Sequence, residues 1–107
     1  MSNYHSYFPR KVGMIHRYMQ SPKELERILK GCGNHRRVEI LCLLQKKPRL
    51  TLGEIADALK INFRIASENI RRMSAGGLMH KRYRGRAVEH ALTPRAKHIL
   101  IFLGKLE

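Results

Sequence analysis

Residues 62–78, NFRIASENIRRMSAGGL, predict a helix with one apolar face and one charged face. Its apolar stripe recurs at i, i+3, i+7 and i+10 and consists of Phe63, Ala66, Ile70 and Met73. Asn62 is a good N-cap, because its side-chain oxygen can accept a first-turn backbone N–H. Gly76-Gly77 suits the helix end.

The opposite face of this helix is polar, and it carries Arg64, Ser67, Glu68, Arg71 and, at its margin, Arg72. Residues 81–86, KRYRGR, follow directly and predict the basic tip of a hairpin. From residue 63 to residue 86, seven Lys and Arg stand against one acid. A charged helix followed by a basic hairpin is typical of a protein that meets a nucleic-acid groove and its phosphates.

Length and charge bound the possible functions. A chain of 107 residues fits one domain. Its 22 Lys and Arg against 8 Asp and Glu give a net charge of +14, which favours a polyanionic partner and above all nucleic acid. An anionic membrane surface, an acidic protein and a merely solvated basic surface are the alternatives.

The N-terminal residues 1–20 form a basic aromatic arm, with three tyrosines, one phenylalanine and no acid. We expect this arm to pack on a partner subunit or to reach DNA, and a disordered tail is the alternative. No leader and no apolar run of bilayer length is visible, so a cytoplasmic location without membrane contact is expected. Two cysteines do not make a disulfide framework.

Residues 21–107 predict the folded domain, and its first two helices are marked by their caps. Ser21-Pro22 starts a helix over about 22–31, whose face of Leu25, Ile28, Leu29 and Cys32 is expected to be buried. Asn34 starts a second helix that ends near Lys46. Because that helix is apolar almost all round, we predict that it is central and buried, with Cys42 in the core.

Thr51 and Glu54 form a capping box at the start of a third helix with the stripe Leu52, Ile55, Ala56 and Leu59. Only residues 60–62 separate it from the helix that begins at Phe63, which predicts a helix-turn-helix unit. The usual glycine of such a turn is missing, and Lys60 stands in that neighbourhood.

Two antiparallel strands are predicted over 78–83 and 86–92, with the bend at Arg84-Gly85 and with Val88, His90 and Leu92 on one face. Thr93-Pro94 starts the last helix, whose stripe is Ala96, Ile99, Leu100 and Leu103. Further apolar residues lie off that stripe: Ile101, Phe102 and Leu106. Their surplus predicts a partner, most simply a second copy of the chain.

The order of these elements resembles the winged helix-turn-helix transcriptional regulators, especially the arsenic-repressor (ArsR) type. Residues 29–41, LKGCGNHRRVEIL, resemble that family's opening, with Asn34 and Arg37 at its Asp and Arg positions. Residues 52–59 match its x-Glu-Ile-Ala-x-x-Leu helix, and Ala66, Ile70, Met73, Gly77 and Leu78 match the core and exit of its recognition helix. Residues 92–96, LTPRA, look more like the MarR type.

The predicted fold class is mainly α with a small β-hairpin wing, in the order α-α-α-α-β-β-α. The predicted function is that of a sequence-specific regulator that binds double-stranded DNA as a homodimer through its N-terminal and C-terminal helices. Helix 63–75 would enter the major groove, and the wing 80–90 would lie on the backbone or in the minor groove. The candidate DNA-binding residues are Phe63, Arg64, Ser67, Glu68, Arg71, Arg72, Lys81, Arg82, Arg84 and Arg86. A non-specific architectural or RNA-binding role and a protein-interaction module with a basic face are the alternatives.

Three positions depart from the ArsR pattern, because polar side chains usually stand where this chain has Phe63, Ile65 and Glu68. The two apolar residues could contact thymine methyl groups, and the glutamate could accept a hydrogen bond from a cytosine amino group. Completion of the core is the alternative for the apolar pair.

Metal, cofactor and catalytic sites are not predicted. Metal sensors of the resembling family use clustered cysteines on the first helix of the helix-turn-helix, or His/Asp pairs on the last helix. Residues 51–59 hold no Cys or His, and the last helix holds only His98. Phosphate-binding glycine loops, nucleophile elbows and paired carboxylates are also missing from the sequence, so an enzyme is not expected.

Overall fold

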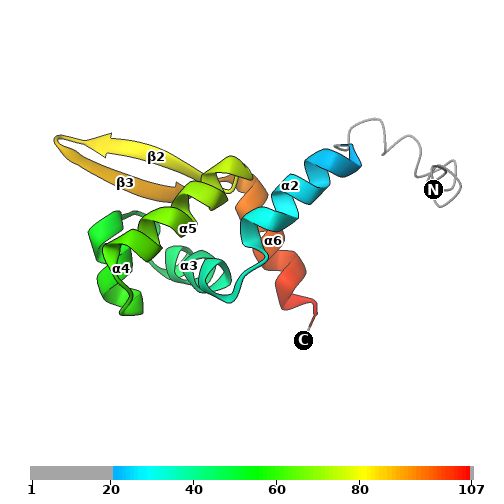
Figure 1. Ribbon diagram of the computed structural model, residues 1–107, viewed down its shortest axis with the longest axis horizontal. Coiled ribbons are helices and arrows are strands. Elements are labelled where there is room, and N and C mark those ends of the chain that lie inside the picture. Colours follow the sequence, from blue (N-terminus) through cyan, green and yellow to red (C-terminus); the bar gives the residue numbers. More distant parts are fainter. Residues whose placement is uncertain (1–20, 107) are drawn as a thin grey trace, which may run out of the picture.

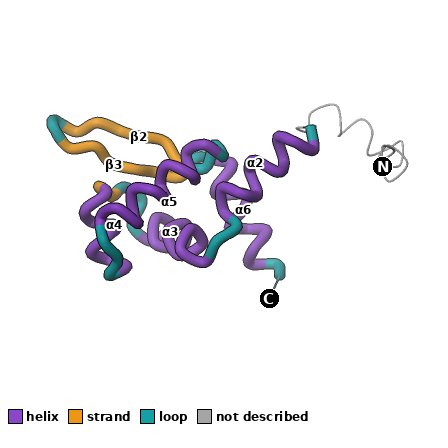
Figure 2. Tube along the Cα trace, viewed as in Figure 1, coloured by secondary structure: helices purple, strands orange, loops and turns teal. Residues whose placement is uncertain are grey.

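The computed structural model describes residues 21–106, within which the chain forms five helices and a small sheet whose hairpin projects from one end of the molecule (Figure 1). The helices are α2 (Pro22–Cys32), α3 (His35–Lys46), α4 (Leu52–Leu59), α5 (Phe63–Ala75) and α6 (Pro94–Gly104). The strands are β1 (Leu50–Thr51), β2 (Met79–Arg84) and β3 (Ala87–Leu92). Four helices therefore precede the hairpin and one follows it, as predicted (Figure 2).

Each helix begins at a polar cap that the sequence predicts. The Asn62 Oδ1 atom accepts the backbone N–H of Ile65 at 2.8 Å, which fixes the first turn of α5. At α4 the capping box is complete, because the Glu54 N–H donates to Thr51 Oγ1 at 3.2 Å and the Thr51 N–H donates to Glu54 Oε1 at 2.8 Å. The caps of α2, α3 and α6 are Ser21, Asn34 and Thr93.

The turn between α4 and α5 keeps the geometry of a helix-turn-helix without its glycine. Lys60 adopts the left-handed conformation, with φ 56° and ψ 45°, and it is the only non-glycine residue with positive φ in the described part of the chain. Its backbone N–H contacts the carbonyl oxygens of Ala56 and Asp57, which closes the last turn of α4. A lysine therefore occupies the position that glycine would usually fill.

The wing consists of β2 and β3 in an antiparallel register that runs from Met79↔Leu92 to Arg84↔Ala87. Its bend lies at Gly85-Arg86, one residue later than predicted. Gly85 has φ +61° whereas Arg86 has negative φ, so the two-residue turn requires glycine at its first position only. A turn of this type is compatible with the right-handed twist of the strands. A bend at Arg84-Gly85 would be incompatible with the observed pairing of Arg84 with Ala87.

A third strand, β1, was not predicted from the sequence. Leu50 pairs with His90 and Thr51 with Glu89, so the sheet has the order β1-β3-β2. The strand has two residues, too few for a period-two pattern to show. It joins the base of the wing to the start of α4.

The core lies between α3, α4, α5 and the base of the wing. Its largest fully buried side chains are Ile40, Leu41, Leu44, Ile55, Met73 and Leu78. The predicted central position of α3 is confirmed by the first three of these. Cys42, however, is exposed, so its predicted place in the core is wrong. The physical reason is that α3 is covered on the face of Ile40, Leu41 and Leu44, and within residues 21–106 no element buries Cys42.

Helix α2 is also less buried than predicted. Leu29 is 60% exposed and Leu25 is 37% exposed, whereas Cys32 at the C-terminal end is buried. The predicted burial of the α2 stripe within the domain is therefore wrong for the two leucines. The cause is visible in Figure 1, where α2 points away from the other helices and only its C-terminal end meets them.

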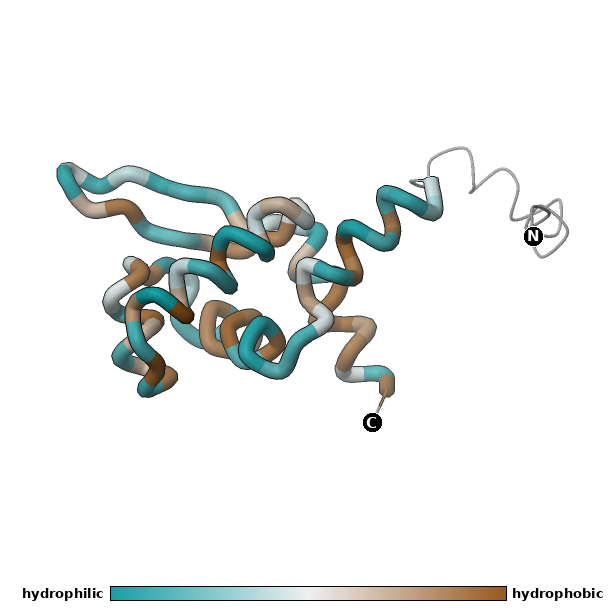
Figure 3. The backbone as a smooth tube through the Cα atoms, in the orientation of Figure 1, coloured by the Kyte–Doolittle hydropathy of each residue, from teal (hydrophilic) through white to brown (hydrophobic). Residues whose placement is uncertain are grey.

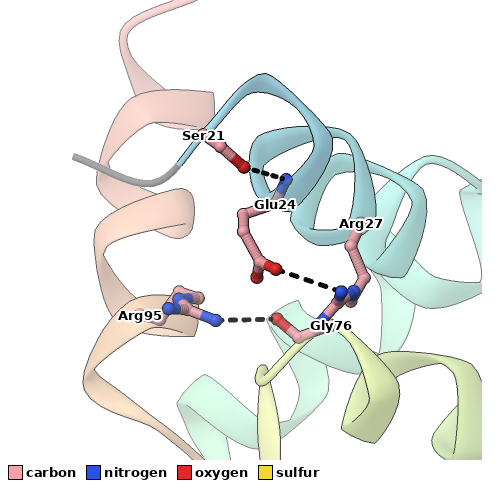
Figure 4. Close-up of polar contacts among 5 residues, drawn as sticks. All are labelled: Ser21, Glu24, Arg27, Gly76 and Arg95. Atoms are coloured by element: carbon pink, nitrogen blue, oxygen red, sulfur yellow. Dashed lines mark hydrogen bonds and ion pairs between the residues drawn. The ribbon is translucent and has the colours of Figure 1, made fainter.

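The attachment of α2 depends on two glycines at its crossing with the end of α5, which we call the α2–α5 junction (Gly31 and Gly76). A Cβ atom on Gly76 would lie 3.1 Å from the Arg27 carbonyl oxygen and 3.2 Å from the Cα of Gly31. The two backbones therefore meet directly. From α6, Arg95 Nη1 donates to the Gly76 carbonyl oxygen at 3.2 Å (Figure 4). Three helices are thus joined at one point.

Candidate nucleic-acid interface

The polar face of α5 is open to solvent along its length. Arg64, Glu68, Arg71 and Arg72 are exposed and Ser67 is half-buried, while Ala66, Ile70 and Met73 on the other face are buried. The core thus fixes the rotation of the helix about its axis. The side chains predicted to meet a groove are those that the domain leaves free.

The two apolar departures from the ArsR pattern are also on the surface. Phe63 is 60% exposed and Ile65 is 40% exposed, so neither completes the core. Both lie in the first turn of α5, where residues of a recognition helix come closest to base edges. Exposed apolar side chains at that position suit contact with thymine methyl groups.

The acid on this face is shared by two arginines. Glu68 lies 3.8 Å from Arg71 Nη2 and 3.9 Å from Arg72 Nη2, and all three side chains are more than half exposed. Exposed pairs of this length contribute little to stability. Arg71 and Arg72 are therefore available to a stronger anion such as a phosphate.

The wing carries the second group of cations, Lys81, Arg82, Arg84 and Arg86, all of which are exposed. Figure 1 shows the wing reaching out at the end of the molecule opposite α2 and α6, and Figure 3 shows that β2 is mostly hydrophilic. Arg84 Nη1 lies 3.5 Å from Glu89, a buried carboxylate of β3. Tyr83, between Arg82 and Arg84, is exposed as well, and its exposure was not predicted.

A polar link holds α5 against α3. Arg37 Nη1 donates to Asn69 Oδ1 at 3.0 Å, and Asn69 Nδ2 donates to the Ile65 carbonyl oxygen at 2.9 Å. Burial lowers the pKa of Arg37, and the nearby charge of Arg72 lowers it further. The Nε atom of Arg37 is buried without a hydrogen-bond partner among the described residues. Arg37 matched the family opening in the sequence, but its role in positioning α5 was missed because its partner lies on another helix.

A buried histidine lies where the wing joins the domain. His90 faces Leu50 of β1 and Lys81 of β2 in the register, and burial lowers its pKa, with a smaller effect in the same direction from Lys81. The neutral imidazole is therefore favoured at the base of the wing. A charge placed there would be costly to bury.

The two cysteines have opposite environments. Cys32 is buried at the α2–α5 junction, where burial raises the pKa of its thiol, while Cys42 is exposed. Within residues 21–106, no group of three or more His, Cys, Asp or Glu side chains is arranged to hold a metal ion. None of the helices in that range combines the length and apolar character needed to cross a bilayer. The predicted arm at residues 1–20 lies outside the described residues.

Comparison with protein families gave a match over residues 34–78 to a family described as winged helix-turn-helix DNA-binding. The matched stretch runs from the cap of α3 to Leu78, the last residue before β2. It therefore contains the whole helix-turn-helix pair. A comparison with curated protein sequences gave no match.

Solved structures share this fold over most of the chain. A homodimeric winged helix-turn-helix DNA-binding domain from Mycobacterium bovis, described as a possible ArsR-family transcriptional regulator, is 24% identical with a TM-score of 0.72, covering 82% of this chain and 87% of its own. HlyU from Vibrio cholerae is 26% identical with a TM-score of 0.70, covering 82% and 97%. The transcriptional repressor PagR of Bacillus anthracis is 21% identical with a TM-score of 0.68, covering 76% and 93%.

These comparisons confirm the resemblance and the fold class predicted from the sequence. The fold is a winged helix-turn-helix, and two of the similar structures are described as a possible and an assigned ArsR-family transcriptional regulator. The MarR-like start of α6 is a minor addition to that resemblance. The matched family is described as DNA-binding, and PagR is described as a transcriptional repressor.

Proposed function

We propose that this chain, a winged helix-turn-helix protein of the ArsR type in its fold, is a sequence-specific transcriptional regulator that binds double-stranded DNA as a homodimer in the cytoplasm. The observation that carries the proposal is the exposed cationic surface of α5 and the wing. Seven Lys and Arg against one acid lie between residues 63 and 86, and all seven are exposed.

Each part of the surface has a distinct role in this proposal. Arg64 and Arg71 would reach guanine edges, because residues early in the second helix of the unit enter the major groove. Glu68 and Ser67 would bond base edges, and Phe63 would contact a thymine methyl group. The DNA backbone or the minor groove would be contacted by the remaining cations: Arg72, Lys81, Arg82, Arg84 and Arg86.

Homodimer formation through α2 and α6 is the second part of the proposal. Five large apolar side chains are exposed on these helices and just after α6: Leu25, Leu29, Ile101, Phe102 and Leu106. They lie at the end of the molecule opposite the wing tip, and Figure 3 shows the apolar character of α6. Pairing there would place two α5 helices side by side on one face of DNA, in successive major grooves about 34 Å apart. The M. bovis domain named above is homodimeric, which supports the formation of a homodimer.

Binding of the full-length protein to duplex DNA across a salt series tests the proposal. Because each dimer would make on the order of six to ten phosphate contacts, the slope of log K against log salt should lie near −5 to −9. Selection from a random duplex pool should return a roughly palindromic site. Arg64→Ala with Arg71→Ala should weaken binding to that site by at least about tenfold. Lys23→Ala with Lys46→Ala removes the same charge from exposed positions elsewhere and should change binding much less.

Three results would overturn parts of the proposal. A salt slope shallower than about −2 would contradict groove and wing contacts. Tight binding without selection would indicate an architectural or RNA-binding protein that reads charge and shape. An intact dimer without duplex binding at physiological salt would assign the basic face to an acidic protein partner.

A further inference from the structure

A cavity of about 430 Å³ lies behind the wing, between α3, the base of the sheet and α6. This volume is within the range of sites for small molecules, about 300–1,000 Å³. The cavity is partly open to solvent and is separate from the groove-facing side of α5, which contributes no residue to its lining. The cavity is therefore not part of the surface through which the helix-turn-helix would contact DNA.

The floor of the cavity is apolar. Leu44 of α3 and Leu92 of β3 are buried in the core, and Leu100 of α6 is half-buried beside them. A floor of leucines favours an alkyl or aryl group, because such a group leaves water when it enters. An inorganic ion would gain nothing from this surface.

The rim of the cavity is cationic. Arg49 comes from the segment after α3, Arg82 from β2 and Lys97 from α6, and no Asp or Glu is among the described residues that line the cavity. All three cations are exposed, and none forms an ion pair within residues 21–106. Three elements thus place unpaired positive charge around one apolar floor.

Glu89 is the acid nearest to this rim in the β2–β3 register, and it forms an ion pair with Arg84. Glu89 is opposite Arg82 in the β2–β3 register, and it lies 3.5 Å from Arg84 Nη1 instead. Because Glu89 pairs with Arg84, Arg82 has no ion-pair partner among residues 21–106. The geometry therefore leaves a positive site without an internal counter-ion.

We propose that this cavity binds a small amphipathic anion, a carboxylate with a short alkyl or aryl tail. The carboxylate would lie among Arg49, Arg82 and Lys97, and the tail would lie on Leu44, Leu92 and Leu100. Arg82 belongs also to the DNA-binding surface proposed above, so an occupied cavity would withdraw one cation from DNA. This second step, effector control of DNA affinity, rests on the proposed function, whereas binding of the anion does not.

The N-terminal arm is a poor alternative occupant. Residues 1–20 contain Arg10, Lys11 and Arg17 and no acid. Like charges on the arm and on the rim would repel each other.

Calorimetric titration of the full-length protein with octanoate, in the absence of DNA, tests the site. Octanoate should bind at least about tenfold more tightly than octan-1-ol, octylammonium or inorganic phosphate, because each of these lacks either the negative charge or the tail. Hexanoate should bind about tenfold more weakly than octanoate, since two buried methylene groups are lost. Equal binding of octanoate and octan-1-ol, or tighter binding of phosphate, would overturn the proposal.

Arg49→Gln with Lys97→Gln should weaken octanoate binding by about tenfold or more, without a change in fold because both side chains are exposed. Lys23→Gln with Lys46→Gln removes the same net charge away from the cavity and should leave the octanoate affinity unchanged. An equal loss in both variants would overturn the site, since it would reduce the effect to net charge.

The link to DNA is measured separately. Saturating octanoate should weaken duplex binding several-fold in the wild type and not in the Arg49→Gln, Lys97→Gln variant. Failure of octanoate to bind, with DNA binding intact, overturns this inference alone. Failure of duplex binding with octanoate bound overturns the proposed function and leaves the cavity assignment standing.

Discussion

Helices α2 and α5 carry the same kind of pattern and end in opposite environments. Both have a polar cap and one apolar stripe at helical spacing. In α5 the stripe of Ala66, Ile70 and Met73 is buried by the chain itself, whereas in α2 Leu25 and Leu29 face solvent. An amphipathic stripe predicts that a face will be covered, but it does not say whether the cover comes from the same chain.

The junction explains the difference. Helix α5 is packed against α2, α3 and α4, while α2 meets the end of α5 and α3 through its C-terminal half, from Arg27 to Cys32. The close approach of Gly31 and Gly76 fixes the crossing point, and the N-terminal end of α2 extends away from the other helices (Figure 1). The α5 stripe therefore belongs to the fold, and we assign the α2 stripe to the proposed dimer.

The largest effect is expected for a truncation inside α5. Ile70→Ala should lower the free energy of unfolding by about 2–5 kcal/mol, because it leaves a cavity in the core. Urea unfolding followed by circular dichroism at several protein concentrations measures this loss. The loss should be the same at every concentration, since it acts within one chain.

Leu29→Ala is the matched truncation in α2. It should change stability only where the protein is dimeric, so its effect should depend on protein concentration. A concentration-independent loss as large as that of Ile70→Ala would contradict the distinction between the two stripes.

The next effect is expected on assembly. Leu29→Lys should raise the dimer dissociation constant by at least about tenfold, equivalent to about 1.4 kcal/mol, while the exposed position lets the domain fold. Sedimentation equilibrium measures the constant. Ala58→Lys adds the same charge at an exposed position of α4 and should leave the dimer intact. A dimer that tolerates Leu29→Lys would exclude α2 from the interface.

A smaller effect is expected at the junction. Gly76→Ala should cost about 1 kcal/mol, because its Cβ would press on the Arg27 carbonyl oxygen and on the Gly31 backbone, and α2 must shift. Thermal unfolding compares it with Gly53→Ala in α4, where an added Cβ meets nothing within 4 Å and the helix should gain up to about 1 kcal/mol. Equal stability of the two variants would show that the close approach does not anchor α2.

The smallest effect is a difference in thiol reactivity. Cys32 at the junction should react with iodoacetamide several-fold more slowly than exposed Cys42, because burial both shields its thiol and raises its pKa. Peptide mass spectrometry of one partly alkylated sample gives both rates. Faster reaction of Cys32 would mean that the junction opens readily and that α2 is not fixed there.

Much of the fold was predictable because its signals are local. The caps at Ser21, Asn34, Thr51, Asn62 and Thr93 each gave the correct helix start. Errors came where the outcome depends on distant residues. Cys42 was assigned to the core because α3 is apolar almost all round, but which faces are covered is decided by the elements that pack on it.

The candidate interface was predictable to a similar degree. The exposed face of α5 follows from the phase of its buried stripe, so the positions of Arg64, Glu68 and Arg71 could be derived. The surface positions of Phe63 and Ile65 could not, because an apolar residue at the margin of a stripe fits either environment. The cavity behind the wing was not predictable at all, since its rim joins Arg49, Arg82 and Lys97 from three separate elements.

Strand β1 sets an order of events during folding. The β2–β3 hairpin closes locally around Gly85-Arg86, a process that takes on the order of microseconds. Pairing of Leu50 with His90 instead closes a long loop, whose entropy opposes early contact. We therefore expect the β2–β3 hairpin to form first and β1 to pair with β3 only after the helices have packed together. The wing would thus form early in folding, and its attachment to the domain through β1 would form late.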